Sequence, residues 1–397
     1  MSETVPEAPL DHRNRVVYSE IILLTLVRLV MNTANRMVYP FMPAFSRGMG
    51  ISTSSGRLLI SARSLAGGLS FLFGPASDRF GRKNVMLAAL GIFCASMLLV
   101  PAAPIFAIVY TVFILIGLAK AIFDPSLQAF VGDSVPYRRR GLGIGIIEMA
   151  WSGALLLTIP IIGILIEKFG WKSPFYFLAV LSFLGMIVVA LRIPRHTKPE
   201  GPSARFNFLH AWQILRQHPV VLSAISFSFA VHVANESIFV VYGEWMEGSF
   251  GLKVGTLGLL TTVIGIAELI GEFLVIFLAD RLGKKRVAAW GILSASIFYL
   301  VFPWLGNSLW LSMSVLFLMF VTWETGIVAA ISLITEQLPE ARGTLMASNV
   351  TGISLGRVVG ALAGGWLWGW AGFAANGLFA CALNVFSVFV LLRNVKD

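Results

Sequence analysis

Asp78-Arg79-Phe80-Gly81-Arg82-Lys83 is the stretch that decides the fold, because the chain contains it twice. The second copy, Asp280-Arg281-Leu282-Gly283-Lys284-Lys285, follows the first by 202 residues. Each copy lies between two long apolar runs. Arg140-Gly141 returns as Arg342-Gly343 at the same offset. Unrelated pairs that share one offset indicate an internal duplication of about half the chain.

The composition excludes a soluble protein. Of the 397 residues, 57% are hydrophobic and 13% are charged, whereas soluble domains carry about 25% charged residues. Lipid is therefore the expected solvent, and helices are the expected elements, because lipid offers no partner to an open backbone. The net charge of +10 comes from basic residues in short loops, so nucleic acid is not an expected partner.

Twelve apolar runs are long enough to span a bilayer. They cover approximately residues 18–42, 54–76, 84–102, 105–132, 141–166, 173–192, 219–243, 254–279, 286–304, 307–334, 343–368 and 372–392. The predicted fold class is an all-α membrane protein, with two parallel pseudo-repeats of six helices each. Such repeats are typical of transporters that bind their substrate at mid-depth between the halves.

The predicted domains are an N-terminal six-helix bundle (1–193), a cytoplasmic linker (194–218) and a C-terminal six-helix bundle (219–397). Within the linker, residues 206–216 suit a short amphipathic helix on the membrane surface. Most loop Lys and Arg lie on the side of the two termini, which predicts that both termini are cytoplasmic. The expected location is the cell membrane, and the expected state is a monomer.

The positions of charge inside the membrane indicate which helices line a polar pathway. A charge that faces lipid costs at least about 2.5–3.5 kcal/mol, and every third predicted helix lacks charge. The remaining helices carry the candidate substrate and proton pathway: Arg28, Asn32, Asn35, Arg36, Tyr39, Lys120, Asp124, Glu148, His232, Asn235, Glu236, Glu268, Glu272, Glu324 and Arg357. Arg63 is a further charge inside the second predicted helix.

The first helix shows the expected facing surface directly. Arg28, Asn32, Asn35, Arg36 and Tyr39 follow one helical stripe. At an offset of 200 residues their counterparts are Ser228, His232, Asn235, Glu236 and Phe239, so the stripe is polar in both halves but its charge is inverted. Two interpretations remain open: the halves form ion pairs, such as Arg36 with Glu236, or they hold an ionic substrate.

Two pairs of charges carry separate predictions. Lys120 and Asp124 are four residues apart and are expected to form a structural ion pair. Glu268 and Glu272 share one helix face, where two like charges tend to retain one proton. They are candidate proton carriers, unless Arg357 neutralises them.

The repeated loop resembles the signature of the major facilitator superfamily. The stretch from Gly74 to Lys83 matches that family's motif between helices 2 and 3, and the helix count and linker fit along nearly the whole chain. The resemblance implies a gate in which Asp78, Arg82 and Asp133 form a charge cluster, with a partial second copy at Asp280, Lys284 and Glu336. The implied gating residues are Gly74, Asp78, Arg79, Gly81, Arg82, Lys83, Asp133, Asp280, Arg281, Gly283 and Lys284.

Helix 5 resembles drug-exporting members in part. The spacing of Pro160 and Gly163 matches their antiporter signature, but Ile159 replaces the expected glycine. The alternative is that small residues simply allow close helix packing. Trp151 and Trp323 are interpreted as packing residues, and Pro40 is expected to bend the first helix.

The sequence therefore predicts a secondary active transporter, most simply a proton-coupled exporter of a lipophilic or drug-like compound. The alternative is a proton-coupled symporter that takes up an anionic or sugar-like nutrient, suggested by the cations of the first half. An enzyme or receptor on the same scaffold is disfavoured, since no catalytic motif or metal-ligand spacing is present. Cys94 and Cys381 lie inside apolar runs, so no disulfide, metal or cofactor is expected.

Overall fold

The computed structural model describes residues 12–73, 77, 79–136, 139–194, 219–338 and 342–395. Every regular element in these ranges is helical, which confirms the predicted fold class. Gly74, Asp78 and the predicted surface helix at 206–216 lie outside the described residues. The predicted domain boundary at 194–218 falls almost wholly in the same gap and stays a prediction.

The first half contains ten of the helical segments. They are α1 (His12–Arg36), α2 (Val38–Met49), α3 (Thr53–Gly67), η1 (Ser70–Leu72), α5 (Arg82–Ala102), α6 (Phe106–Ser134), α7 (Arg140–Gly153), η3 (Ala154–Thr158), α8 (Ile159–Phe169) and α9 (Ser173–Arg192). The second half contains α11 (Pro219–Phe250), α12 (Val254–Leu282), α13 (Lys284–Val301), η4 (Phe302–Trp304), α14 (Leu309–Ile334), α15 (Arg342–Ala371) and α16 (Phe373–Asn394).

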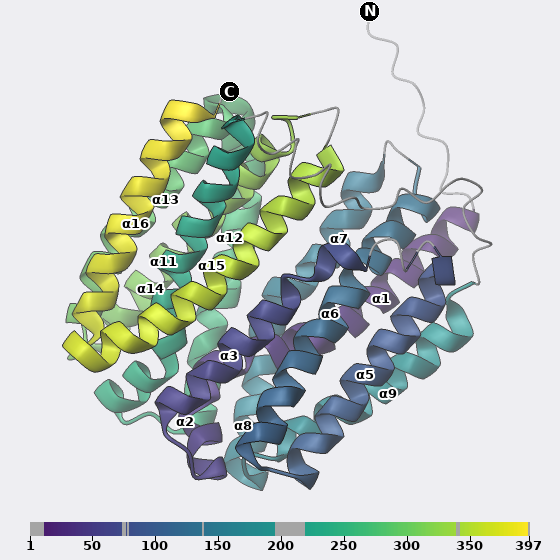
Figure 1. Cartoon of the computed structure of the whole chain (residues 1–397), viewed down its shortest axis with the longest axis horizontal. Coiled ribbons are helices and arrows are strands. Elements are labelled where there is room, and N and C mark those ends of the chain that lie inside the picture. Colours follow the sequence, from purple (N-terminus) through teal and green to yellow (C-terminus); the bar gives the residue numbers. More distant parts are fainter. Residues whose placement is uncertain are drawn as a thin grey trace, which may run out of the picture.

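The two halves lie side by side and repeat the same packing (Figure 1). In the first half α5 packs on α6 and α9, and in the second half α13 packs on α14 and α16. The helices predicted to lack charge are α5, α9, α13 and α16, and each packs against helices of its own half. Their position away from the contact between the halves explains why their sequences need no ionic side chains.

Eleven helices in the described residues are long and apolar enough to cross a membrane. The remaining predicted span, residues 54–76, is not among these eleven, because α3 has only 15 residues and is followed by the short η1. Arg57 and Arg63 are both buried in α3, so this helix is polar on the side that meets the protein. The helix therefore fits an interior position better than a lipid-facing one.

Two prolines mark interruptions in the helices at the centre of the molecule. The first predicted span breaks between α1 and α2 at Met37, three residues before Pro40. A helical proline clashes with the carbonyl four residues earlier, which here belongs to Arg36. Pro160 follows the π-helical turn η3, Ala154–Thr158, and single π turns are frequent at functional sites.

The halves meet mainly where α2 packs on α11, α3 on α15, and α8 on α12, and α12 also contacts α2, α7 and η3. Glycine makes this approach close. A Cβ built on Gly163 of α8 would lie 3.2 Å from Gly258 Cα of α12, and one on Gly243 of α11 would lie 2.4 Å from the Tyr39 carbonyl oxygen. The glycine of the antiporter-like stretch therefore packs directly against the other half.

Candidate functional site

An ion pair buried at the centre of the molecule joins the two halves. Arg36, the last residue of α1, donates two hydrogen bonds to the carboxylate of Glu268 on α12, at 2.6 and 2.5 Å. The side chains are only 2% and 1% exposed. Bidentate guanidinium–carboxylate pairs are among the strongest polar contacts, so this pair holds α1 and α12 in a defined register.

Two more carboxylates of the second half lie near this pair. Glu272, one helical turn after Glu268, accepts a hydrogen bond of 2.9 Å from the Ser152 hydroxyl of the first half. Glu324 is 7% exposed on α14, and Gly271 of α12 packs against its Cβ. Within the described residues Glu324 has no hydrogen-bond or ion-pair partner. The sequence suggested that Arg357 could neutralise Glu268 and Glu272. In the structure Arg36, and not Arg357, neutralises Glu268.

The suggested pair of Arg36 with Glu236 is not formed. Glu236 instead accepts a hydrogen bond of 2.8 Å from the Tyr39 hydroxyl, and Arg63 donates to the same hydroxyl at 2.9 Å. Arg63 also donates to the Asn35 carbonyl oxygen. Arg36 and Tyr39 are three positions apart on one helical stripe, but they contact different helices of the second half, α12 and α11.

Trp151 is more than the packing residue that the sequence suggested. Its ring receives the Arg36 guanidinium at 4.4 Å, the Arg357 guanidinium at 5.2 Å and the Lys120 ammonium at 6.0 Å. A tryptophan face attracts cations through its quadrupole. Trp151 therefore gathers three cations, from both halves, around one ring. Trp323, in contrast, is buried against His232 and Phe320, as packing predicts.

The charges of α1, α6 and α7 balance one another inside the first half. The Lys120 ammonium lies 2.6 Å from Asp124, which confirms the predicted pair. Arg28 lies 3.1 Å from the same carboxylate and 3.0 Å from Glu148. Lys120 also donates to the Asn32 amide oxygen at 2.7 Å. These two cations and two anions form a neutral cluster, so their net contribution to the field at the centre is small.

The remaining predicted site residues take structural contacts. The His232 ring lies 2.8 Å from the Ser228 carbonyl oxygen. Asn235 accepts a hydrogen bond of 2.7 Å from the Tyr299 hydroxyl, which ties α11 to α13. The Asn35 amide donates to the Met31 carbonyl oxygen of its own helix. These polar groups are satisfied within their own half, apart from the ionic contacts described above.

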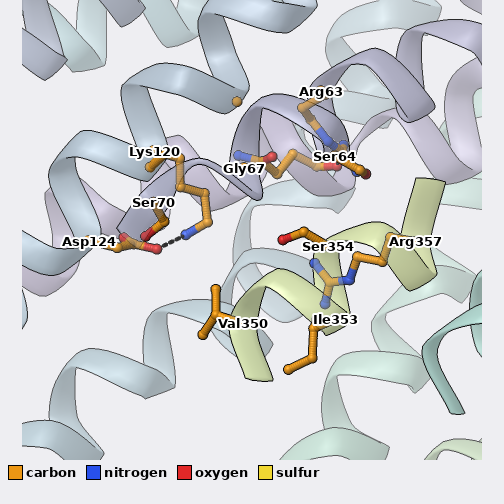
Figure 2. Close-up of a pocket in the computed structure, with 13 residues that line it drawn as sticks. Arg63, Ser64, Gly67, Ser70, Lys120, Asp124, Val350, Ile353, Ser354 and Arg357 are labelled. Carbon is orange, nitrogen blue, oxygen red and sulfur yellow. Dashed lines mark hydrogen bonds and ion pairs between the residues drawn. The ribbon is translucent and has the colours of Figure 1, made fainter. Parts of the chain in front are cut away.

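A cavity of about 190 Å³ lies between the halves. It is lined by α1, α3 and α6 on one side and by α15 on the other. Figure 2 shows Lys120, Asp124 and Ser70 facing Val350 and Ser354 across it, with Arg63 and Arg357 farther along. The cavity is the place where a small molecule touches both halves at once.

A further set of contacts between the halves was not anticipated from the sequence. We call them the far-end ion pairs: Arg47 with Glu247 at 2.6 Å, and Arg57 with Glu244 at 3.3 Å. Arg57 also donates to the Gly365 carbonyl oxygen at 2.9 Å. They involve the ends of α2 and α11 and the start of α3, at the opposite end from the C-terminus (Figure 1). In the sequence, the only sign of these pairs is that Arg47 and Arg57 lie on the side opposite the termini, where few basic residues occur.

The repeated loops form matching structures at the other end. Gly81 and Gly283 have nearly the same backbone, with φ of 85° and 86° and ψ of 141° in both. Positive φ at this position favours glycine, which explains why both copies retain it. Arg82 lies 3.1 Å from Asp133, and Lys284 lies 2.5 Å from Glu336. Each pair stays within its own half.

The gating residues that remain show no cross-half contact of their own in the described residues. Lys83 donates to the Ala190 carbonyl oxygen at 2.6 Å, and the Arg79 guanidinium lies over the Phe80 ring. Arg281 is exposed. Because Asp78 lies outside the described residues, the predicted cluster is seen only through its Arg82–Asp133 part.

The described helices are of membrane-spanning length, they form two similarly packed halves, and buried ion pairs join these halves. These features define a multi-pass membrane protein of the transporter class. The Major Facilitator Superfamily model matches residues 24–236 and 225–397. The chain therefore belongs to this superfamily, whose members are transport proteins, and the resemblance inferred from the repeated loop is confirmed.

Several relatives align over most of the chain. An "Uncharacterized MFS-type transporter YceJ" of Bacillus subtilis is 27% identical over 353 residues, which is 88% of this chain and 89% of the relative. "Multidrug resistance protein MdtG" of Proteus mirabilis is 26% identical over 366 residues, 89% of this chain and 90% of the relative. The crystal structure of a D-xylose-proton symporter shares the fold, with a TM-score of 0.75, 16% identity, and coverage of 96% and 98%.

Proposed function

We propose that this chain is a secondary active transporter that exports a lipophilic or drug-like compound in exchange for protons. The observation that carries the proposal is the buried ion pair between Arg36 and Glu268 at the contact of the halves. Two halves that rock against each other must change their contacts at this depth. A proton on Glu268 removes one partner of the pair, and so links proton binding to the position of α12 relative to α1.

The neighbouring carboxylates support a path for that proton. Glu272 is half-buried and hydrogen-bonded to Ser152, and Glu324 is buried without an ionic partner in the described part of the chain. Ionisable groups inside a membrane are expensive and mark proton and substrate pathways. We therefore propose that protons reach Glu268 through these two residues.

The far-end ion pairs support alternating access. They join the halves at the end away from the C-terminus, whereas the Arg82–Asp133 and Lys284–Glu336 pairs at the other end each stay within one half. We propose that this arrangement is the state open toward the termini. Export then requires the far-end ion pairs to separate while the two repeated loops approach each other.

The proposal includes the membrane and its orientation. The protein lies in the cell membrane as a monomer with both termini in the cytoplasm, as the distribution of basic loops predicts. Tags at the two termini, digested by an added protease in right-side-out and inside-out vesicles, test the orientation. Digestion in inside-out vesicles alone is expected, and digestion of either tag in right-side-out vesicles would contradict it.

The direction of transport is tested with the purified chain in proteoliposomes that contain a pH-sensitive dye. A fluorescent lipophilic dye of the kind exported by drug transporters is added, and dye and protons are followed together. Exchange predicts that they move in opposite directions. Alkalinisation outside the vesicle, in step with dye entry, would instead indicate the alternative, a proton-coupled uptake symporter for an anionic or sugar-like nutrient.

A further inference from the structure

The charges that line the cavity between the halves are unequal. Arg63, Lys120 and Arg357 line it, together with a single carboxylate, Asp124. Lys120 and Asp124 neutralise each other at 2.6 Å. The remaining guanidinium groups belong to Arg63 on α3 and Arg357 on α15, one from each half.

Neither of these guanidinium groups forms an ion pair within the described residues. Arg63 donates to two neutral oxygens, the Tyr39 hydroxyl and the Asn35 carbonyl. Arg357 lies over the Trp151 ring at 5.2 Å. Two carboxylates outside the cavity lining interact with these arginines: Glu236, which accepts a hydrogen bond from the Tyr39 hydroxyl, interacts with both, and Glu324 interacts with Arg357. Among the residues that line the cavity itself, the only carboxylate is Asp124, which Lys120 already neutralises, so the two guanidinium groups have no anionic partner in the lining.

A hydroxyl group in the cavity wall also lacks a partner. Ser64 is 7% exposed, lines the cavity, and its Oγ has no hydrogen-bond partner. A buried hydroxyl without a partner costs about 1–3 kcal/mol. Figure 2 places Ser64 beside Arg63, on the wall opposite Ser354. A bound acceptor that reached the Ser64 hydroxyl would remove this cost.

Part of the wall is apolar. Val350 and Ile353 of α15 line the cavity together with Gly117 and Ala121 of α6. A cavity of about 150 Å³ can hold benzene, so about 190 Å³ accommodates one ring and a compact acidic group. Guanidinium groups recognise carboxylates through paired, planar hydrogen bonds.

From this geometry we infer that the cavity is a binding site for compact organic anions, in which Arg357 and Ser64 bind the acidic group and α6 and α15 bind the apolar body. The inference rests on the proposed function in one respect, that the cavity between the halves receives the transported compound. It narrows the lipophilic substrate to one that carries a negative charge.

Benzoate, with benzamide as its neutral isostere and benzylammonium as its cationic analogue, tests the inference without a gradient. The full chain is purified with Cys94→Ser and Cys381→Ser, and Gly67→Cys introduces a thiol at the cavity wall. A Cβ at Gly67 meets nothing closer than Ser354 Oγ at 4.0 Å. The three compounds are compared as protectants of this thiol against N-ethylmaleimide. Benzoate is expected to protect at roughly tenfold or more lower concentration than benzamide.

Substitutions then assign the acidic group. Arg357→Gln is expected to raise the protecting concentration of benzoate about tenfold to a hundredfold, with little change for benzamide. Arg357→Lys restores part of the effect, and Ser64→Ala weakens benzoate by about threefold to tenfold. The matched control is Arg393→Gln, at the exposed end of α16, which leaves both compounds unchanged.

Equal protection by benzoate and benzamide, or no protection by benzoate, overturns the inference even if Arg357→Gln fails to fold. The proposed function fails separately. If benzoate protects in an Arg357-dependent manner but no compound moves with protons in vesicles, the anion site stands and coupled transport falls. If a lipophilic dye exchanges with protons while acid and amide protect equally, only the inference on anions falls.

Discussion

The two repeated halves use their buried charges in different ways. In the first half Arg28, Lys120, Asp124 and Glu148 neutralise one another on neighbouring helices. In the second half Glu236, Glu268 and Glu272 each accept a hydrogen bond from a residue of the first half. Four charges of the first half thus neutralise one another, whereas these three carboxylates of the second half take their hydrogen bonds from the first half. The difference teaches that the duplication has diverged to make the contact between the halves ionic.

The largest expected effect comes from breaking the central pair. Glu268→Gln leaves the Arg36 guanidinium buried without its anion, which typically costs about 3–5 kcal/mol. Thermal unfolding of the purified protein is expected to shift sharply downward, and proton-coupled transport is lost. The double variant Arg36→Met with Glu268→Met should recover most of the stability, because two apolar groups replace a buried pair, but not the transport. A Glu268→Gln protein as stable as the parent would contradict this account.

Glu236→Gln is expected to have a smaller effect on stability and a large one on coupling. The amide oxygen still accepts the Tyr39 hydroxyl, so the fold is retained, but the group no longer carries a charge or a proton. Coupled transport in proteoliposomes is expected to disappear while the unfolding temperature changes little. Tyr39→Phe, which removes the hydroxyl that links Glu236 to Arg63, is the matched comparison. Full gradient-driven activity in Glu236→Gln would remove this residue from the pathway.

The far-end ion pairs give the next effect, on the balance between conformations. Arg57→Gln removes the contacts of a buried guanidinium with Glu244 and the Gly365 carbonyl, worth about 1–3 kcal/mol. An impermeant thiol reagent added from the far end should label Gly67→Cys faster in this variant. Lys253→Gln, in the same region but outside the far-end ion pairs, is the control. Unchanged labelling with Arg57→Gln would show that these pairs do not hold that end closed.

The smallest effects are expected at the repeated loops. Glu336 and Asp133 are 55% and 41% exposed, and exposed ion pairs contribute about 0–1 kcal/mol. Lys284→Gln and Arg82→Gln should therefore change the unfolding temperature little and by similar amounts. A much larger loss from Arg82→Gln than from Lys284→Gln would show that the two copies have diverged in stability as well as in sequence.

Much of the fold follows from sequence, since helix length, loop charge and a constant repeat offset are local or periodic properties. The repeated loop led to the family. The absence of charge from every third helix set these helices apart from the polar pathway, and in the structure α5, α9, α13 and α16 pack within their own halves. The Lys120–Asp124 pair was predictable because both residues lie on one helix, four positions apart. The candidate list also contained the residues that meet at the centre.

The choice of partners was not predictable in the same way. The sequence suggested Arg36 with Glu236, but the structure pairs Arg36 with Glu268 and places Tyr39 against Glu236. Periodicity places Arg36 and Tyr39 on one stripe, but it does not show which helix of the second half each residue contacts. Trp151 was missed for a related reason, since a tryptophan inside an apolar run has no signal that three cations will surround its ring.

The amino-acid sequence already showed that this chain is helical, duplicated and embedded in lipid. The length of an apolar run and the offset of a repeat can both be read directly from the order of the residues. Only the tertiary structure decided which acid meets which base, which end the ion pairs hold together, and that Arg63 and Arg357 face one cavity. Those outcomes depend on the tilt and rotation of helices that belong to different halves of the chain. Small changes in these angles exchange one buried partner for another.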